Sequence, residues 1–217
     1  FRRVSYEKYI LGIFLALFFL VGGIFFGNYL AEKKTNDISV SQKAISALLS
    51  VIELKETLSQ QGEMDYCNLS HEYIWNEKVA IGTILTALEG RLGKDNLQVG
   101  EQKTIYNEVQ LKTLNLVRKV NENCNKRWDI ILFFYTNDKH DSNGDYGLGE
   151  LQGYALDGLY SGNKETVKIF SFDAGLKTPS IIQMMQEYNL TRTPALVVND
   201  KSYPRFMSKG EIQRIIG

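Results

Sequence analysis

Two cysteines, Cys67 and Cys124, are the residues of this chain best suited to chemistry. Two thiols can form one disulfide, but they cannot build a multi-bridge scaffold or a four-thiolate zinc site. They stand far apart in the sequence, whereas a catalytic dithiol is generally a closely spaced motif. We therefore expect a structural disulfide between Cys67 and Cys124, with two separate buried thiols as the alternative.

A polar loop is the second candidate for chemistry. Asp141, Asn143 and Asp145 begin like a calcium-binding loop. However, Tyr146 stands where that loop requires a turn glycine, and Gln152 stands where it requires a bidentate carboxylate. The pattern therefore favours a solvated polar loop.

The histidine count and the net charge exclude further kinds of site. His71 and His140 are the only histidines, too few for a metal cluster without many carboxylates. Lys and Arg total 25, Asp and Glu total 25, and the formal net charge is zero, so the charge gives no reason to expect a nucleic-acid partner. We predict no metal, no cofactor and no nucleic acid.

A long uncharged segment, Tyr9 to Ala31, indicates a membrane anchor. About 20 apolar residues in a helix cross the hydrocarbon core of a bilayer. A cleaved secretory signal is the alternative, but its apolar region usually has only about 7–15 residues. We predict a retained transmembrane helix held by membrane lipid. Within it, Gly23 and Gly27 match the small-xxx-small motif through which such helices can pair into a homo-oligomer.

Basic residues at the two ends of this segment predict its orientation. Arg2, Arg3 and Lys8 precede it, and Lys33 and Lys34 follow it. The small excess of positive charge before the helix favours a cytoplasmic N-terminus, because basic flanks are retained in the cytoplasm. The bulk of the chain would then be extracytoplasmic.

Two glycosylation sequons favour the same orientation. They are Asn68-Leu69-Ser70 and Asn189-Leu190-Thr191. Glycans on Asn68 or Asn189 and a stable disulfide both belong outside the cytoplasm. We therefore predict an extracytoplasmic glycoprotein.

Residues 32–126 contain no proline and show three apolar stripes with helical spacing. Ser39-Val40-Ser41-Gln42 has the pattern of a capping box, which predicts that the first of three helices begins there. We expect three amphipathic helices that form either a short bundle or a membrane-proximal stalk. The stripes consist of Ile45, Leu48, Leu49 and Ile52, then Ile81, Leu85, Leu88 and Leu92, then Val109, Leu116 and Val120.

The two cysteines fit this helical arrangement. Cys67 lies just before the second predicted helix, and Cys124 lies at the end of the third. An antiparallel hairpin of these helices brings the two positions together. On the chain-entropy account, a bridge that closes so long a loop contributes about 4 kcal/mol.

Residues 127–217 alternate between strand and helix patterns. The apolar run at 128–135 is typical of a buried central strand. The predicted order is a strand at 128–135, a helix at 148–160, a strand at 167–172, a helix at 181–188, a strand at 195–198, a hairpin turn at Asn199-Asp200, a strand at 203–206 and a short helix capped by 208–211.

This order resembles the thioredoxin superfamily over residues 128–217. The specific elements are the Phe-Phe-Tyr that ends the first strand, Phe172-Asp173 at the end of the second, and the segment from Tyr188 to Val198. The resemblance implies an α/β domain in which the Thr193–Pro194 bond is cis. In that family this proline shapes a groove where an extended peptide or a partner binds.

The chain departs from the family at the site of its chemistry. A working thioredoxin carries Cys-x-x-Cys at the start of its first helix, where the helix N-terminus lowers the thiol pKa. No cysteine follows Cys124. The segment Glu150 to Tyr154 is similar to the helix after the second cysteine in membrane-anchored thioredoxin-like proteins, some of them archaeal. The thiol positions would then be Tyr146 and Gly149, and the resemblance implies a redox-inactive domain without catalytic residues.

Together these patterns predict a cytoplasmic N-terminus (1–8), a transmembrane helix (9–31), a helical extracytoplasmic region (32–126) and a thioredoxin-like domain (127–217). We expect a protein that binds or scaffolds a protein or peptide, for example as a subunit of an envelope complex. Two alternatives stay open: a thiol-disulfide oxidoreductase or isomerase that uses Cys67 and Cys124, and a structural surface component that assembles through its helices.

Overall fold

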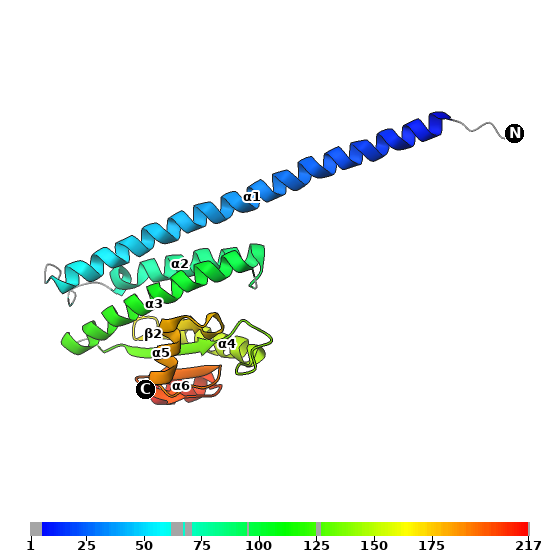
Figure 1. The fold of residues 1–217 in the computed structure, drawn as a ribbon. Helices are drawn as coiled ribbons and strands as arrows, with labels where there is room; N and C mark the ends of the chain where they lie inside the picture. Colours follow the sequence, from blue (N-terminus) through cyan, green and yellow to red (C-terminus); the bar gives the residue numbers. More distant parts are fainter. Residues whose placement is uncertain (1–5, 62–66, 68–70, 95, 125–126, 217) are drawn as a thin grey trace. The chain divides into compact units, whose positions relative to one another are not determined.

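The structure is a computed structural model that describes residues 6–61, 67, 71–94, 96–124 and 127–216 (Figure 1). The chain divides into two compact units, Phe1–Lys43 and Ala44–Gly217. Helix α1 (Tyr6–Gln60) contributes residues to both.

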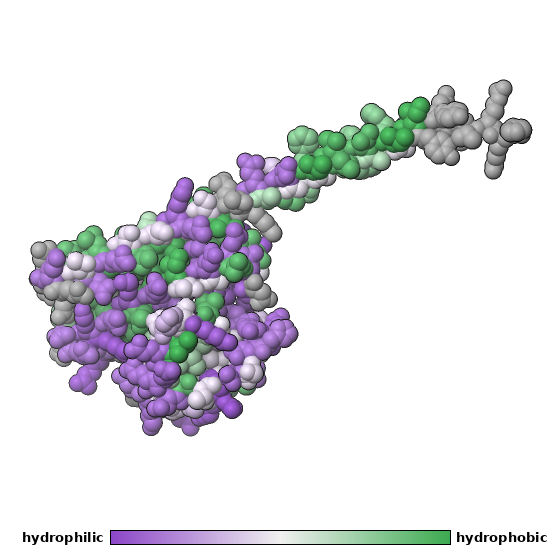
Figure 2. Space-filling model, in the orientation of Figure 1, coloured by the Kyte–Doolittle hydropathy of each residue, from purple (hydrophilic) through white to green (hydrophobic). Residues whose placement is uncertain are grey.

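In the first unit, α1 carries the apolar segment that the sequence predicts. Ile10–Glu32 is 23 residues long and apolar enough to cross a membrane. No residue in the most apolar stretch of this segment is buried in the described structure. Figure 2 shows apolar side chains along this part of the helix. The position matches the segment 9–31 expected from the sequence.

No helix begins at Ser39, so the expectation drawn from the capping-box pattern is wrong. Helix α1 continues through this point to Gln60. No glycine or proline occurs between Asn28 and Gln61, so nothing in the sequence interrupts the helix. The first amphipathic stripe therefore lies on the same helix as the apolar segment.

The second unit begins with three packed helices, the end of α1, α2 (His71–Leu92) and α3 (Leu97–Asn123). Residues from each of the three predicted apolar stripes meet in one cluster, and Figure 1 shows α2 and α3 side by side. The cluster contains Ile45, Ile52, Ile81 and Val109. These helices therefore form a short bundle, one of the two arrangements expected.

A sheet with strand order β2-β1-β3-β4 follows the bundle. The strands are β1 (Asp129–Tyr135), β2 (Val167–Asp173), β3 (Ala195–Val198) and β4 (Lys201–Tyr203). β1 pairs in parallel with β2 and antiparallel with β3, and β3 pairs antiparallel with β4. The apolar run at 128–135 thus supplies a central strand, as predicted.

Helices cover both faces of this sheet. They are α4 (Tyr146–Gly162), α5 (Pro179–Glu187) and α6 (Lys209–Ile216), with a short 3₁₀ turn, η1 (Ala174–Leu176), after β2. Because side chains alternate along a strand, Leu132 and Phe134 of β1 pack toward α3 and α5, whereas Ile131 and Phe133 pack toward α4 and α6. Each face therefore has its own core.

Helix α3 belongs to the core of the sheet as well as to the bundle. Leu114, Val117 and Val120 of α3 are fully buried against the β1, β2 and α5 residues of one face. The boundary drawn from the sequence near residue 126 therefore lies within a single compact unit.

Strand β4 is shorter and begins earlier than the sequence suggests. It spans Lys201–Tyr203 rather than 203–206. Asn199 and Asp200 both have positive φ, as a tight hairpin turn requires, so pairing starts immediately after them. Pro204 then ends the strand because it has no N–H to donate.

Candidate functional site

The candidate site is a groove at the carboxyl end of β1. Its cavity volume is about 480 Å³, within the range of natural ligand-binding clefts. Four parts of the chain line it: the loop 142–145, Leu148 of α4, residues 191–194, and residues 204–206.

Thr193 and Pro194 form one wall of the groove, and the peptide bond between them is cis. Both residues are buried. Ala195, the next residue, pairs with Phe134 of β1, so the sheet fixes this wall at its carboxyl edge. The bond is the isomer expected from the sequence.

The main chain of Thr193 is already paired with the protein's own loop. Thr193 N donates to Asn143 O at 3.0 Å, and Asp145 N donates to Thr193 O at 2.9 Å. Gly144 and Thr193 therefore form an isolated parallel β-bridge. The loop takes the place that an added strand would occupy on this side of Thr193.

Gly144 permits this close approach. A Cβ at this position would overlap Thr136 Cγ2 and would lie 2.9 Å from Thr193 Oγ1. The Thr193 hydroxyl is itself buried and has no hydrogen-bond partner in the described part of the chain. Buried hydroxyls usually have a hydrogen-bond partner. Because this one has none among the described residues, its oxygen is free to accept a hydrogen bond from a ligand.

Tyr146 and Gly149, the positions assigned to the missing thiols, lie in the first turn of α4. Asp145 caps this helix by accepting from Leu148 N at 2.9 Å. Tyr146 donates its hydroxyl proton to Glu150 at 2.7 Å, which raises the pKa of the phenol. Gly149 is buried. Neither position supplies sulfur for thiol-disulfide exchange.

Two lysines surround the Tyr146 ring. Lys94 Nζ lies 5.6 Å and Lys139 Nζ lies 5.2 Å from the ring centroid. Lys94 also donates to Glu150 at 2.9 Å. Hydrogen bonds from Tyr146 and then Lys94 lower the pKa of the Glu150 carboxyl. The surface around Tyr146 is therefore aromatic and charged.

A buried polar cluster lies behind the site, at the carboxyl ends of β1 and β2. Lys103 pairs with Glu89 at 2.7 Å and with Asp173 at 3.5 Å, and Asp173 accepts from Asn137 at 2.9 Å. Burial raises the pKa of Asp173; burial and then the charge of Asp173 raise the pKa of Tyr135. Because Asn137 begins the loop, the cluster anchors its start.

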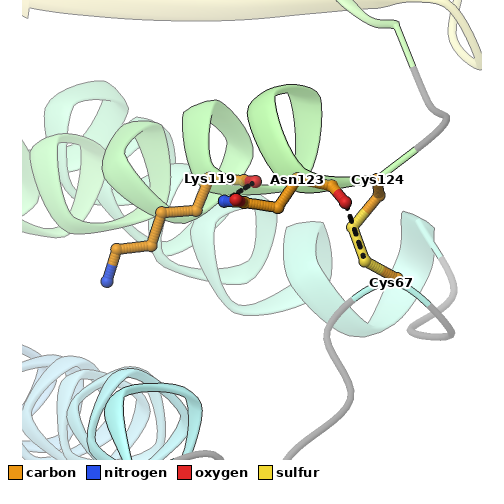
Figure 3. The surroundings of a disulfide bond; sticks show 4 residues. All are labelled: Cys67, Lys119, Asn123 and Cys124. Atoms are coloured by element: carbon orange, nitrogen blue, oxygen red, sulfur yellow. Dashed lines mark hydrogen bonds between the residues drawn. A yellow bond between two sulfur atoms is a disulfide. The ribbon is translucent and has the colours of Figure 1, made fainter.

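Cys67 and Cys124 form a disulfide, as predicted, with Cα atoms 5.3 Å apart (Figure 3). Cys124 ends α3, and Asn121 in the last turn bonds both main-chain atoms of Trp128, just before β1. The groove lies at the other end of this seven-residue strand, about 20 Å away at ~3.3 Å per residue. The structure does not bring the disulfide and the groove together.

Two of the carboxylates considered for calcium have other partners. Asp141 Oδ1 accepts from Asn143 N at 3.0 Å, and Asp145 Oδ1 accepts from Leu148 N at 2.9 Å, so these carboxylates shape the loop and cap α4. Gln152 points elsewhere and bonds both main-chain atoms of Met207. Among the residues that the structure describes, no group of three or more His, Cys, Asp or Glu side chains could hold a metal ion.

The remaining sequence candidates lie away from the groove or outside the described residues. Asn189 is exposed and has a φ of 54° at the end of α5. Asn68 lies outside the described residues. Gly23 and Gly27 have open space where a Cβ would stand.

Several groove residues were not identified by the sequence analysis. They come from three segments that are distant in the sequence, and no local motif marks them. They are Leu148, Arg192, Pro204, Arg205 and Phe206. The sequence offers one indication of the last three: apolar and basic side chains follow the hairpin at 204–206, where the sequence analysis expected a strand.

Comparison with known protein families finds no match to this chain. No match is found among curated proteins or solved structures either. The function is therefore inferred from the geometry of the groove and of the cysteine pair.

Proposed function

We propose that residues 128–217 form a thioredoxin-like domain that has lost its thiols and binds a protein or peptide at the groove around Pro194. The strand order β2-β1-β3-β4, with β1 parallel to β2 and antiparallel to β3, supports this fold. Helices on both faces support it further. The domain carries an α/β scaffold and a cleft without a nucleophilic sulfur.

The main observation in favour of a binding role is that the groove and the cysteine pair lie far apart. Exchange requires direct attack of a thiolate on a disulfide sulfur. Cys67 and Cys124 are bonded to each other beyond the far end of β1. Tyr146 and Gly149 lie at the start of α4, directly after the groove residue Asp145, and line a separate pocket rather than the groove itself. This arrangement favours binding over oxidoreductase or isomerase activity.

The membrane arrangement forms part of the same proposal. Ile10–Glu32 anchors the protein, with the N-terminus in the cytoplasm and the second unit outside it. The disulfide supports this orientation because such bonds persist in oxidising compartments. A tethered binding domain suits a subunit of an envelope complex.

Photocrosslinking in native membranes tests the binding site. The full chain carries a photoreactive phenylalanine analogue at Leu148, which lines the groove, or at Tyr154, which lies further along α4 and on another side of the helix. Both positions are exposed, with exposed fractions of 40% and 71%. A protein adduct at Leu148 and none at Tyr154 is the expected result.

The opposite pattern contradicts the proposal. Adducts at Tyr154 alone would place the partner on another surface of α4. Absence of adducts at both positions, with adducts from probes on the bundle, would favour a structural component that assembles through its helices.

A further inference from the structure

The loop 141–145 pairs with Thr193 through two main-chain hydrogen bonds, at 3.0 Å and 2.9 Å. These are the atoms that an extended chain uses when it adds to an exposed strand. We propose that this loop is an internal placeholder, and that the partner is an extended polypeptide segment that displaces it and pairs with Thr193 in its place. The inference rests on the proposed function of the groove and names the mode of binding.

The loop is anchored at its two ends, where Asn137 donates to Asp173 and Asp145 caps α4, but the part between them makes few contacts that would oppose its displacement. Its residues from Asn137 to Asp145 are all polar or glycine, and none of them is buried. It therefore gains little from apolar burial, which is the main favourable contribution to docking. Its pairing with the sheet edge is a single bridge between Gly144 and Thr193.

Removal of the loop would expose a surface suited to an extended chain. Leu148, Pro194, Pro204 and Phe206 already line the groove beside the paired atoms. A strand that pairs with Thr193 would direct alternate side chains toward this apolar wall. The inference therefore assigns an apolar anchor residue to the partner.

The buried hydroxyl of Thr193 supports an external ligand independently of the loop. Its Oγ1 lacks a hydrogen-bond partner among the described residues while the loop is docked, and the threonine is only 6% exposed. The loop therefore satisfies the main chain of Thr193 but not its side chain. An incoming segment that pairs with the main chain of Thr193 and also presents one further donor to its hydroxyl would satisfy both.

The charged side chains that line the groove predict one further property of the partner. Arg192 and Arg205 line it together with a single carboxylate, Asp145, which caps α4. Arg205 also pairs with Glu211 at 3.1 Å. The remaining positive character favours an acidic residue next to the apolar anchor.

The test compares two glycine substitutions in the full chain. Gly144→Ala adds a methyl group that would overlap Thr136 and crowd Thr193 Oγ1, so the loop must move. Gly147→Ala is the control, because a Cβ there stands 3.5 Å from Asp145 Oδ1, an ordinary contact. Asp141→Ala provides a second route, since it removes the carboxylate that bonds Asn143 N without adding bulk.

Two readouts are taken on each variant. Hydrogen exchange at the amides of Asp145 and Thr193 should be faster by tenfold or more in Gly144→Ala and in Asp141→Ala, with the amides of β1 unchanged. The photocrosslink yield from position 148 should rise several-fold in the same two variants. The Gly147→Ala variant should match the wild type in both readouts.

The outcomes separate this inference from the function on which it rests. If the loop amides are released but the adduct yield at position 148 stays equal or falls, the partner does not compete with the loop, and the groove remains a binding site of another kind. If no variant gives an adduct at position 148, the binding function fails and the inference fails with it.

Discussion

Gln110 of α3 bonds both main-chain atoms of Ser171 on the outer edge of β2. Its Nε2 donates to Ser171 O, and Ser171 N donates to its Oε1 at 2.8 Å. The side-chain amide thus occupies the position that a neighbouring strand would take, and it is fully buried. An edge strand with unpaired main-chain groups is prone to pair with other chains, so Gln110 protects β2.

Replacement of Gln110 by Leu should destabilise the second unit by about 1–3 kcal/mol, because it leaves a buried N–H and C=O without partners. Urea unfolding of the full chain in detergent measures this loss. Gln98→Leu on the same helix is the control, since Gln98 is exposed and should change stability by less than about 0.5 kcal/mol. Equal effects of the two changes would show that the Gln110 pairing contributes nothing.

The disulfide should stabilise the bundle through the long loop that it closes. Cys67 and Cys124 are 57 residues apart in the sequence, which corresponds to a loss of about 4 kcal/mol in a Cys67→Ser/Cys124→Ser variant. Urea unfolding of the oxidised wild type, the reduced wild type and the variant measures it. Reduced wild type and variant should agree, and an unchanged midpoint in both would contradict the assignment.

Lys78 of α2 contacts the same edge strand, β2, and should make the free energy of unfolding depend on pH. Its amine donates to Ile169 O at 2.6 Å and lies 4.3 Å from the Trp75 ring, and burial lowers its pKa from 10.5 to about 7. From about pH 7 to 10 the folded chain therefore binds fewer protons than the unfolded chain. The free energy of unfolding should rise with pH across this window.

The Lys78→Met variant should lose most of this rise, whereas Lys201→Met, at an exposed position on β4, should retain it. Unfolding free energies at pH 7, 8 and 9 provide the comparison. A wild type whose stability falls over this range, or a Lys78→Met variant with the wild-type slope, would refute the assignment to Lys78.

The periodic elements could be predicted because burial imposes a pattern on each of them. The alternation of Ile131, Leu132, Phe133 and Phe134 between two faces follows from a strand covered on both sides. The helix ends were less predictable. The Ser39 pattern satisfied a local rule, but an unbroken helical sequence on both sides of it took precedence.

The polar contacts of the site could not be predicted from the sequence. The pairing of the loop with Thr193 joins residues about fifty positions apart through main-chain atoms, which every residue carries. Gln110 and Gln152 bond main-chain groups at Ser171 and Met207 in the same way. Such contacts depend on the tertiary arrangement and leave no periodic signal.

Placing two thiols in the first turn of α4 is the most direct test of the proposal that this domain carries a thioredoxin-like site without its chemistry. A Cβ at Gly149 would lie 3.8 Å from Tyr135 Cβ, so a cysteine fits there, and the Tyr146→Cys/Gly149→Cys variant places two thiols in the first turn of α4. Tyr146→Cys/Gly153→Cys is the control, because its cysteines lie about two turns apart on the helix.

Insulin reduction is measured for the wild type and both double variants. We expect no turnover by the wild type, a disulfide and measurable turnover in the Tyr146→Cys/Gly149→Cys variant, and none in the control. Wild-type turnover comparable with an ordinary thioredoxin would contradict the redox-inactive assignment. A Tyr146→Cys/Gly149→Cys variant no more active than its control would contradict the thioredoxin-like site.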